Sequence, residues 1–386
     1  MQPQTIAETL LAERFNGKLQ LCVEAQIQSS NRTRVYRCRV MSGPATAPPT
    51  VIVKQATHAY GATFDGAVDG NVWNDWAGLQ FVSVVASDVA SPQVYAGDPA
   101  AGLIVLEDLG DRPSLGDILA GADNEKAADS LIRYGAMLGT LHARTRGQEH
   151  AFHRMRAGLG AYDPEREFYQ HQYTRLRQRF RDLTSALAIT PPPGAAADLE
   201  IVLAALQHPG PFTVYRHGDP TPLNVLVNET TPYLLDFEYG SYGHALMEGV
   251  YARMLFPSSG FVNHIPAPVI ERVEAAYRSA FVPGCPAAAD DTFFAQAVVV
   301  ACAYWAITHS VWLPFADLLE EDQRWGIATM RQRVIVRAER FADTVEEASY
   351  LEALGETFRM IANKLRSIWP EAADSLPLYP AFRATH

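Results

Sequence analysis

Short apolar runs separated by polar links fill the first part of the chain, and they predict strands. The runs cover residues 20–27, 34–40, 50–54, 93–95 and 102–106. Runs of this length that are bounded by turn residues and rich in β-branched residues are typical of strands. Two segments with apolar positions near one face, residues 6–15 and 71–86, instead predict helices. We therefore expect a small sheet with accompanying helices.

Helical patterns dominate from residue 108 onward. Residues 126–144 show this best, because Leu131, Tyr134, Leu138 and Leu141 recur on one face. Further helices are expected at residues 114–119, 165–187, 198–206, 268–281, 291–312, 317–340 and 345–369, and residues 239–255 are expected to pass from a turn into a helix. The patterns predict an α+β fold with two lobes: a small sheet lobe over residues 1–107 and a larger, mainly helical lobe over residues 108–386.

One stretch of the helical lobe, residues 214–238, departs from this pattern and predicts a hairpin. Its two apolar runs, residues 225–227 and 233–235, flank a polar link that contains a proline, as a turn does. Polar side chains surround this hairpin in the sequence: His217, Asp219, Asn224, Asp236 and Glu238. The second lobe therefore carries a dense group of oxygen ligands and acid–base groups.

Asp and Asn often do no more than cap turns, so a single D-x-x-x-x-N has little meaning. Here it occurs as H-x-D-x-x-x-x-N, followed one hairpin later by D-F-E. Phosphoryl transfer from a nucleotide needs such a set: a carboxylate that orients or deprotonates a hydroxyl, and oxygen ligands for magnesium ions that bridge the phosphates. The combined pattern favours this chemistry over turn capping.

Composition narrows the class of protein. The chain has 386 residues and a formal net charge of −11, which argues against a nucleic-acid binder and is compatible with a cationic substrate. Its four cysteines form no C-x-x-C, so neither a zinc site nor a disulfide framework is expected. No signal peptide is recognised, and no apolar run approaches the ~18 residues of a membrane span. We therefore expect a cytoplasmic protein with no membrane partner.

Only four of the 32 basic residues are lysines, so a lysine within a strand stands out. Lys54 ends the apolar run of residues 50–54. Such a lysine can pair with the α- and β-phosphates of a nucleotide if a nearby helix supplies an acidic partner. Asp75 is the candidate partner and Asp69 its rival, while a solvated lysine on an edge strand is the simpler alternative.

These residues together resemble the aminoglycoside phosphotransferase and choline kinase superfamily, whose fold is protein-kinase-like. The resemblance runs from about Gln28 to Leu255 and is most specific in HGDPTPLNVLV and LLDFEYGSYGHALMEGVYARM. It implies an antiparallel sheet in the first lobe and a nucleotide site between the lobes. It also implies roles for single residues: Asp219 is the catalytic aspartate, Asn224 and Asp236 are magnesium ligands, Lys54 and Asp75 are the nucleotide lysine and its partner, and Ser30 belongs to the phosphate loop.

The resemblance implies ATP and Mg²⁺ as cofactors, with backbone groups near Glu107 and Leu109 reading the adenine edge. Four departures from the family pattern stand out: the sequence of residues 220–222, the aspartate at position 75, Glu248 in place of the aspartate that usually anchors the catalytic loop, and a phosphate loop without glycine. None of them removes the base or a metal ligand. The Asp-Phe-Glu-Tyr run is closer to choline and ethanolamine kinases than to most aminoglycoside enzymes.

The predicted function is therefore ATP-dependent transfer of the γ-phosphate to a hydroxyl of a small molecule, with cationic amino alcohols and aminoglycosides among the candidate acceptors. The alternative is a catalytically silent nucleotide-binding regulatory protein of the same fold. A protein kinase is disfavoured, since Gly218 stands where the arginine of His-Arg-Asp would be. The aromatic and acidic residues between 304 and 322 are expected to serve helix packing rather than ammonium binding. The oligomeric state is left open.

Overall fold

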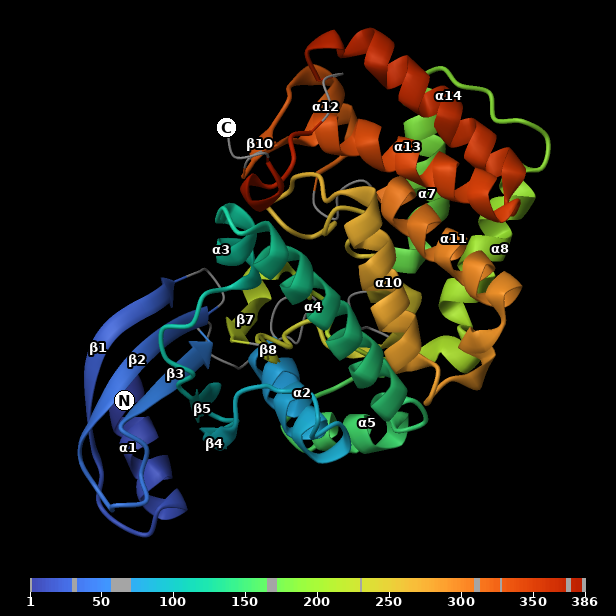
Figure 1. Cartoon of the computed structure of the whole chain (residues 1–386). Coiled ribbons are helices and arrows are strands. Elements are labelled where there is room, and N and C mark those ends of the chain that lie inside the picture. Colours follow the sequence, from blue (N-terminus) through green and yellow to red (C-terminus); the bar gives the residue numbers. More distant parts are fainter. Residues whose placement is uncertain are drawn as a thin grey trace.

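The structure is a computed structural model that describes residues 2–29, 33–56, 71–164, 172–229, 231–308, 313–326, 328–372 and 376–383. Its N-terminal part is a five-stranded antiparallel sheet with the strand order β1-β2-β3-β5-β4. The strands are β1 (Gln20–Ser29), β2 (Thr33–Ser42), β3 (Thr50–Ala56), β4 (Val94–Asp98) and β5 (Leu103–Glu107). Figure 1 shows this sheet at one end of the molecule and the C-terminal helices at the other.

The two faces of the sheet pack against different helices, because successive side chains of a strand point to opposite faces. Val51 and Val53 of β3 pack with α1 (Pro3–Arg14) in a small core. Ile52 instead packs against the large core, which contains α2 (Asn71–Val85). Lys54 has the same parity as Ile52, so the strand places its side chain on the face that meets α2 rather than α1.

The remainder of the described chain is mainly helical and surrounds one large hydrophobic core. Its helices are α3 (Leu115–Ala120), α4 (Asn124–Thr145), α5 (Glu149–Ala157), α7 (Leu176–Ala186), α8 (Ala195–Gln207), α9 (Leu246–Gly249), α10 (Ala267–Phe281), α11 (Asp291–Thr308), α12 (Phe315–Glu320), α13 (Met330–Ala348) and α14 (Glu352–Ile368). Asp123 caps α4 by accepting the N–H of Lys126. As Figure 1 shows, α4 crosses the middle of the molecule beside α10.

Three short antiparallel pairs of strands interrupt the helical part. They are β6 (Thr213–Arg216) with β9 (Ser241–His244), β7 (Val225–Asn228) with β8 (Thr231–Leu234), and β10 (Arg324–Trp325) with β11 (Ala328–Thr329). Single 3₁₀ turns lie at Gly210–Phe212, Pro222–Asn224, Pro286–Ala289, Pro370–Ala372 and Pro380–Phe382. The β7–β8 pair confirms the predicted hairpin, and β6 and β9 were not predicted. The predicted α+β class is also confirmed.

Three helix predictions need correction. Residues 239–255 form β9 and the four-residue α9, because β9 pairs with β6. Residues 317–340 are split by the β10–β11 hairpin, where Gly326 adopts a left-handed φ of 70°. Residues 345–369 are split between α13 and α14, since Ser349 and Leu351 also have positive φ. Residues 165–171 and 309–312 of other predicted helices lie outside the described residues.

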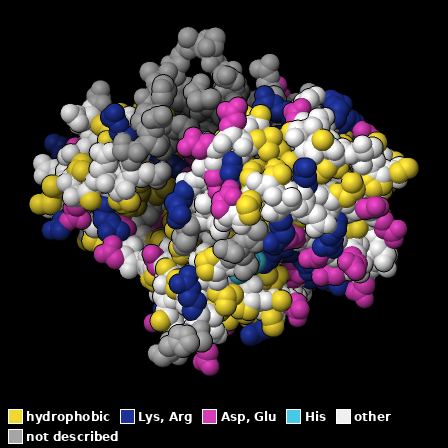
Figure 2. Space-filling model, turned by 90° about the horizontal axis from the view of Figure 1, so that it is seen from above, with side chains coloured by type: hydrophobic (Ala, Val, Ile, Leu, Met, Phe, Trp, Pro, Cys, Tyr) yellow, Lys and Arg dark blue, Asp and Glu magenta, His cyan; other side chains and the backbone are white. Residues whose placement is uncertain are grey.

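Helix α11 is, among the described helices, the one that is long and apolar enough to cross a membrane, although no apolar run of that length was predicted. Its residues from Val299 to Thr308 are buried, and Trp305 donates its indole N–H to the carbonyl of Met247 at 2.9 Å. This environment is that of a core helix. On the face shown in Figure 2, acidic and basic side chains are interspersed, as on a solvated surface.

Candidate active site

Lys54 joins two acidic residues that lie far apart in the sequence. Its Nζ donates to Asp75 Oδ2 at 2.8 Å and also contacts Asp236 Oδ1. Burial by itself would lower the pKa of Lys54, but the carboxylates of Asp236 and Asp75 outweigh burial and raise this pKa. The structure therefore contains the expected Lys54–Asp75 pair, with the ammonium held in its charged form. Asp69, the rival partner, lies outside the described residues.

Asp75 also holds the backbone of the Asp-Phe-Glu segment, residues 236–238. Its Oδ1 accepts the N–H of Phe237 at 2.8 Å. The contact depends on Gly78, one turn further along α2, because a Cβ there would lie 2.7 Å from Phe237 Cβ and 2.4 Å from Tyr215 Oη. Gly78 was not among the site residues predicted from the sequence. Its signal was a glycine inside an apolar helix, which often marks close packing.

The Asp-Phe-Glu segment has a strained start. Asp236 adopts a φ of 66°, a left-handed conformation that is uncommon for residues other than glycine. Asn74, next to Asp75 on α2, donates its side-chain amide to the carbonyl of Glu238 at 3.3 Å. Contacts from α2 to the two residues that follow Asp236 thus help to hold it in a conformation that it would rarely adopt alone.

Asp219 and Asn224 form the second half of the site. The Asn224 amide nitrogen donates to Asp219 Oδ2 at 3.1 Å and to the carbonyl of Asp219 at 2.9 Å. Asp219 Oδ1 is buried and has no hydrogen-bond partner among the described residues. The amide nitrogen of Asn224 faces Asp219. The amide oxygen of Asn224, Oδ1, is therefore the atom that can bind a cation. The arrangement leaves one carboxylate oxygen for a hydroxyl and one amide oxygen for a metal ion.

The environment of Asp219 favours proton uptake. Burial raises its pKa to about 7, the carboxylates of Asp236 and Glu238 act in the same direction, and the neighbouring Ser258 hydroxyl and Asn224 act against them. A carboxylate in such a setting accepts a proton more readily than a solvated one.

His217 closes the loop of residues 217–224, called the catalytic loop below. Its Nε2 bonds to the carbonyl of Leu235 at 2.7 Å, and its Nδ1 accepts the N–H of Asp219 at 3.2 Å. Because a carbonyl can only accept, Nε2 carries the hydrogen. Burial lowers the pKa of His217, despite the opposing effect of Glu248. His217 therefore supports the loop.

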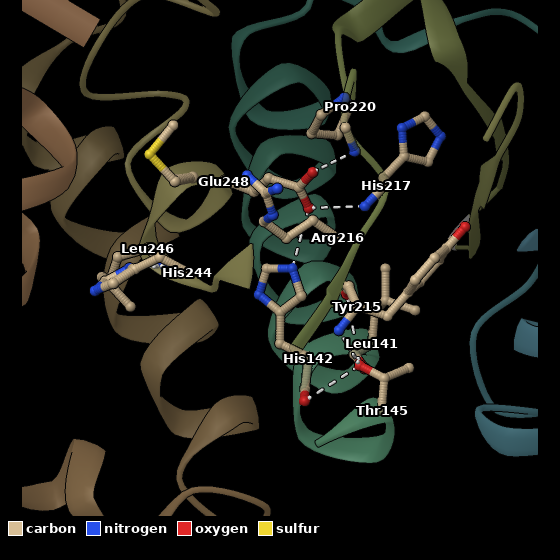
Figure 3. Close-up of polar contacts among 12 residues, drawn as sticks. Leu141, His142, Thr145, Tyr215, Arg216, His217, Pro220, His244, Leu246 and Glu248 are labelled. Carbon is tan, nitrogen blue, oxygen red and sulfur yellow. Dashed lines mark hydrogen bonds and ion pairs between the residues drawn. The ribbon is translucent and has the colours of Figure 1, made fainter. Parts of the chain in front are cut away.

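Glu248 anchors the start of the catalytic loop (Figure 3). Its Oε1 accepts the N–H of Gly218 at 2.6 Å and its Oε2 accepts the N–H of His217 at 3.2 Å. Gly218 has a φ of 90°, and a Cβ there would lie 2.2 Å from the carbonyl oxygen of Tyr239. A glycine is therefore required between His217 and Asp219, where a protein kinase has arginine. The longer side chain of Glu248 reaches both N–H groups of the loop.

The donor set of the site fits magnesium better than a transition metal. The described residues contain no group of three His, Cys, Asp or Glu side chains arranged to hold a metal ion. Asp236 and Asn224 offer oxygen atoms, and the carbonyl of Asn224 accepts the N–H of Leu235 at 2.9 Å, which ties the two loops together. Magnesium prefers oxygen ligands and is commonly held by one or two protein oxygens together with phosphates.

The other predicted residues lie elsewhere. Ser30 lies outside the described residues. Glu107 ends β5 and pairs with Val51, three residues before Lys54 on β3, so it lies about 10 Å along the strand from that lysine. Leu109 follows it and is buried. Their role in adenine binding stays a prediction.

The aromatic residues of the segment 304–322 are packed, as expected. Tyr304 and Trp305 are buried on α11, and Tyr304 makes an edge contact with the ring of Tyr173. Phe315 is buried as well, while Trp312 lies outside the described residues. Burial of these rings supports the helix-packing interpretation over ammonium binding.

Comparison with known families agrees with this geometry. The family model described as the phosphotransferase enzyme family, APH, matches residues 79–289, which is more than half of the chain. The chain belongs to this phosphotransferase family. The match includes the catalytic loop, the Asp-Phe-Glu segment and Glu248, and it begins after Lys54 and Asp75. A comparison with curated proteins finds no match.

Solved structures with a similar fold include a phosphotransferase that acts on macrolides and proteins of the choline kinase type. The macrolide 2'-phosphotransferase MphH from Brachybacterium faecium has 17% identity and a TM-score of 0.40, over 77% of this chain and 91% of that chain. The choline kinase LicA from Streptococcus pneumoniae has 14% identity and a TM-score of 0.43, over 89% and 99%. A choline/ethanolamine kinase family protein from Mesorhizobium loti has 16% identity and a TM-score of 0.45, over 93% and 100%. With TM-scores below 0.5, these likenesses assign no substrate.

Proposed function

We propose that this phosphotransferase-family protein transfers the γ-phosphoryl group of ATP to a hydroxyl of a small molecule. The observation that carries the proposal is the pairing of Asp219 with Asn224, which leaves Asp219 Oδ1 buried and without a partner among the described residues. The Ser258 hydroxyl is near enough to lower the pKa of Asp219 but makes no hydrogen bond to Oδ1, so this oxygen can still accept a hydrogen from an acceptor hydroxyl. Lys54 and Asp236 meet beside it, where the phosphates of the nucleotide would lie.

In this mechanism Asp219 orients the acceptor hydroxyl and receives its proton. The acceptor oxygen forms a bond to the γ-phosphorus, the bond from that phosphorus to the β–γ bridging oxygen breaks, and ADP leaves with the bonding electrons. Asn224 and Asp236 would hold Mg²⁺, which neutralises charge on the phosphates when bound. Lys54 pairs with the α- and β-phosphates and is kept in place by Asp75. Since the transition state is loose, positioning of these groups contributes more than strong base catalysis.

An acceptor that carries a positive charge suits this site. Asp236 and Glu238 act electrostatically on Asp219, and the whole chain has a formal net charge of −11. Negative potential at a site raises the local concentration of cations and speeds their encounter. We therefore place amino alcohols and aminoglycosides first among the acceptors. A cytoplasmic location remains the expectation from the sequence.

The decisive test measures ADP release from Mg²⁺–ATP in the presence of a panel of hydroxylated amines and sugars. We expect one class of acceptor to stimulate ADP release, and the Asp219→Asn variant to lose about a thousandfold or more in kcat, in line with the loss of a proton acceptor and of hydroxyl orientation. The same variant should keep its affinity for ADP. Equal turnover by wild type and Asp219→Asn would refute the mechanism. Nucleotide binding without turnover for any acceptor would favour the silent regulatory protein.

A further inference from the structure

Helix α4 runs beside the strand and loop that lead to Asp219, and it contacts them from its middle and from its C-terminal end. Thr145 Oγ1 accepts the N–H of Tyr215 at 3.2 Å, two residues before the catalytic loop. Tyr134 donates its hydroxyl to the carbonyl of Pro220 at 2.8 Å, directly after Asp219. The helix therefore fixes the backbone on both sides of the catalytic aspartate.

Between these two contacts, α4 is connected to the loop by a buried series of hydrogen-bonded side chains. His142 Nε2 bonds to Glu248 Oε2 at 3.0 Å, and His142 Nδ1 bonds to the Tyr277 hydroxyl at 2.8 Å. Glu248 in turn accepts the N–H groups of His217 and Gly218 (Figure 3). The chain thus connects α10, α4 and α9 to the first two residues of the catalytic loop.

One assignment of hydrogens satisfies every contact of this network with a neutral imidazole. The Glu248 carboxylate, as an acceptor of two backbone N–H groups, needs a donor from His142, so Nε2 carries the hydrogen. His142 Nδ1 then accepts the Tyr277 hydroxyl hydrogen. In this hydrogen-bond network no donor faces another donor. Removing one of its side chains therefore leaves a buried polar atom without its partner.

We propose that His142 is a positioning residue for phosphoryl transfer, which acts through Glu248 on the backbone of His217 and Gly218. The inference rests on the proposed function in taking Asp219 as the group that meets the acceptor. His142 itself touches neither the Asp-Phe-Glu segment nor Lys54 through any contact among the described residues. Its loss should therefore disturb the Asp219 side of the site and spare the nucleotide side, which Asp75 holds separately.

The first readout needs no turnover. Hydrogen–deuterium exchange of the full-length protein without ligand should show about tenfold faster exchange for the amides of His217 and Gly218 in His142→Ala, because the loss of a partner loosens a buried hydrogen-bond network. His244→Ala is the matched control. His244 is equally buried in the same region, but its Nδ1 accepts the N–H of Leu246 and bonds to neither Glu248 nor the catalytic loop. Unchanged exchange of the loop in His142→Ala would overturn the proposal.

The second readout separates positioning from general destabilisation. In His142→Ala, kcat should fall by about tenfold to a hundredfold, since a misplaced reacting group costs this much, while the dissociation constant for Mg²⁺–ADP stays within about twofold. Tyr277→Phe removes only the hydroxyl and should give the same pattern with a smaller loss, which provides a variant if His142→Ala does not fold. An equal loss of nucleotide affinity and kcat would overturn the proposal. If the wild type transfers phosphate to no acceptor, the proposed function fails, and the exchange measurement still decides the role of His142.

Discussion

Two buried carboxylates, Asp75 and Glu248, hold the two halves of the site in different ways. Their exposed fractions are 1% and 3%, so burial does not distinguish them. Asp75 accepts one backbone N–H and one ammonium hydrogen, whereas Glu248 accepts two backbone N–H groups and one imidazole N–H. The nucleotide half is therefore built around an ion pair, and the acceptor half is built around hydrogen bonds to the backbone.

The acid–base behaviour of the two carboxyls follows this difference. Burial raises the pKa of Asp75, and Lys54 and the Phe237 N–H oppose it without cancelling it. Burial acts in the same direction on Glu248, but the hydrogen bond from His142 and the nearby basic groups outweigh it and lower the pKa. Each carboxyl also differs by one methylene from the residue usual in the family. The shorter Asp75 suffices because Gly78 lets α2 approach Phe237 closely.

The largest expected effect comes from breaking the ion pair. Asp75→Ala should lower the free energy of unfolding by about 3–5 kcal/mol, because it removes a partner of a buried cation and also leaves the Phe237 N–H without its acceptor. It should weaken binding of Mg²⁺–ADP in parallel, since Lys54 and Asp236 lose their support. Urea unfolding and calorimetric titration measure the two quantities.

A matched variant separates the two roles of Asp75. Asp75→Asn keeps the size and the oxygen that accepts the Phe237 N–H, but it removes the charge and replaces the oxygen that accepts from Lys54 with an NH₂ group that cannot accept. It should therefore fall between wild type and Asp75→Ala in stability. If Asp75→Ala unfolds within about 1 kcal/mol of wild type, the pair contributes no more than an exposed one and the contrast with Glu248 is wrong.

A smaller loss is expected at Glu248. Glu248→Gln should lower the free energy of unfolding by about 1–3 kcal/mol, because one carboxylate oxygen becomes an NH₂ group that faces a buried donor. Its kcat should fall, while its affinity for Mg²⁺–ADP should change by no more than about twofold. Glu248→Asp is the control, since it keeps the charge but shortens the reach to His217 and Gly218. A nucleotide affinity that falls as strongly as in Asp75→Ala would show that the two halves are not independent.

The residues of the two halves of the site were easier to predict from the sequence than the contacts between them. Spacing and residue type suffice for the D-F-E run, whereas the strand lysine and the helix aspartate were candidates that the family resemblance favoured. The residue pattern offered Asp75 as a partner of Lys54 with Asp69 as its rival, the family resemblance favoured Asp75, and the structure contains that pair. The hairpin after Asn224 was visible because its two apolar runs are short and flank a turn.

Contacts between distant segments could not be predicted in this way. No local signal around His142 indicates that Glu248 lies 3.0 Å away, 106 residues further along the chain. β6 and β9 were missed because each has four residues and owes its structure to pairing with the other. The break in the predicted helix of residues 317–340 was also missed. It lies at the β10–β11 hairpin, where the conformation of Gly326 depends on tertiary packing.

The smallest expected effect concerns pH and tests the hydrogen-bonded carboxyl by itself. The pKa of Glu248 lies below its usual value of 4.5 in the folded protein, so the folded state binds its proton less readily than the unfolded chain. The stabilisation due to its charge is therefore complete above pH 4.5 and is lost as the pH falls through the folded pKa. The difference in unfolding free energy between wild type and Glu248→Gln should accordingly be constant near neutral pH and shrink below pH 4.5. Glu271→Gln, which removes an exposed carboxylate on α10, controls for net charge. A wild-type-to-Glu248→Gln difference that grows on acidification would mean that burial dominates at Glu248 as it does at Asp75, and that the hydrogen bonds of His142 and the loop do not distinguish the two halves of the site.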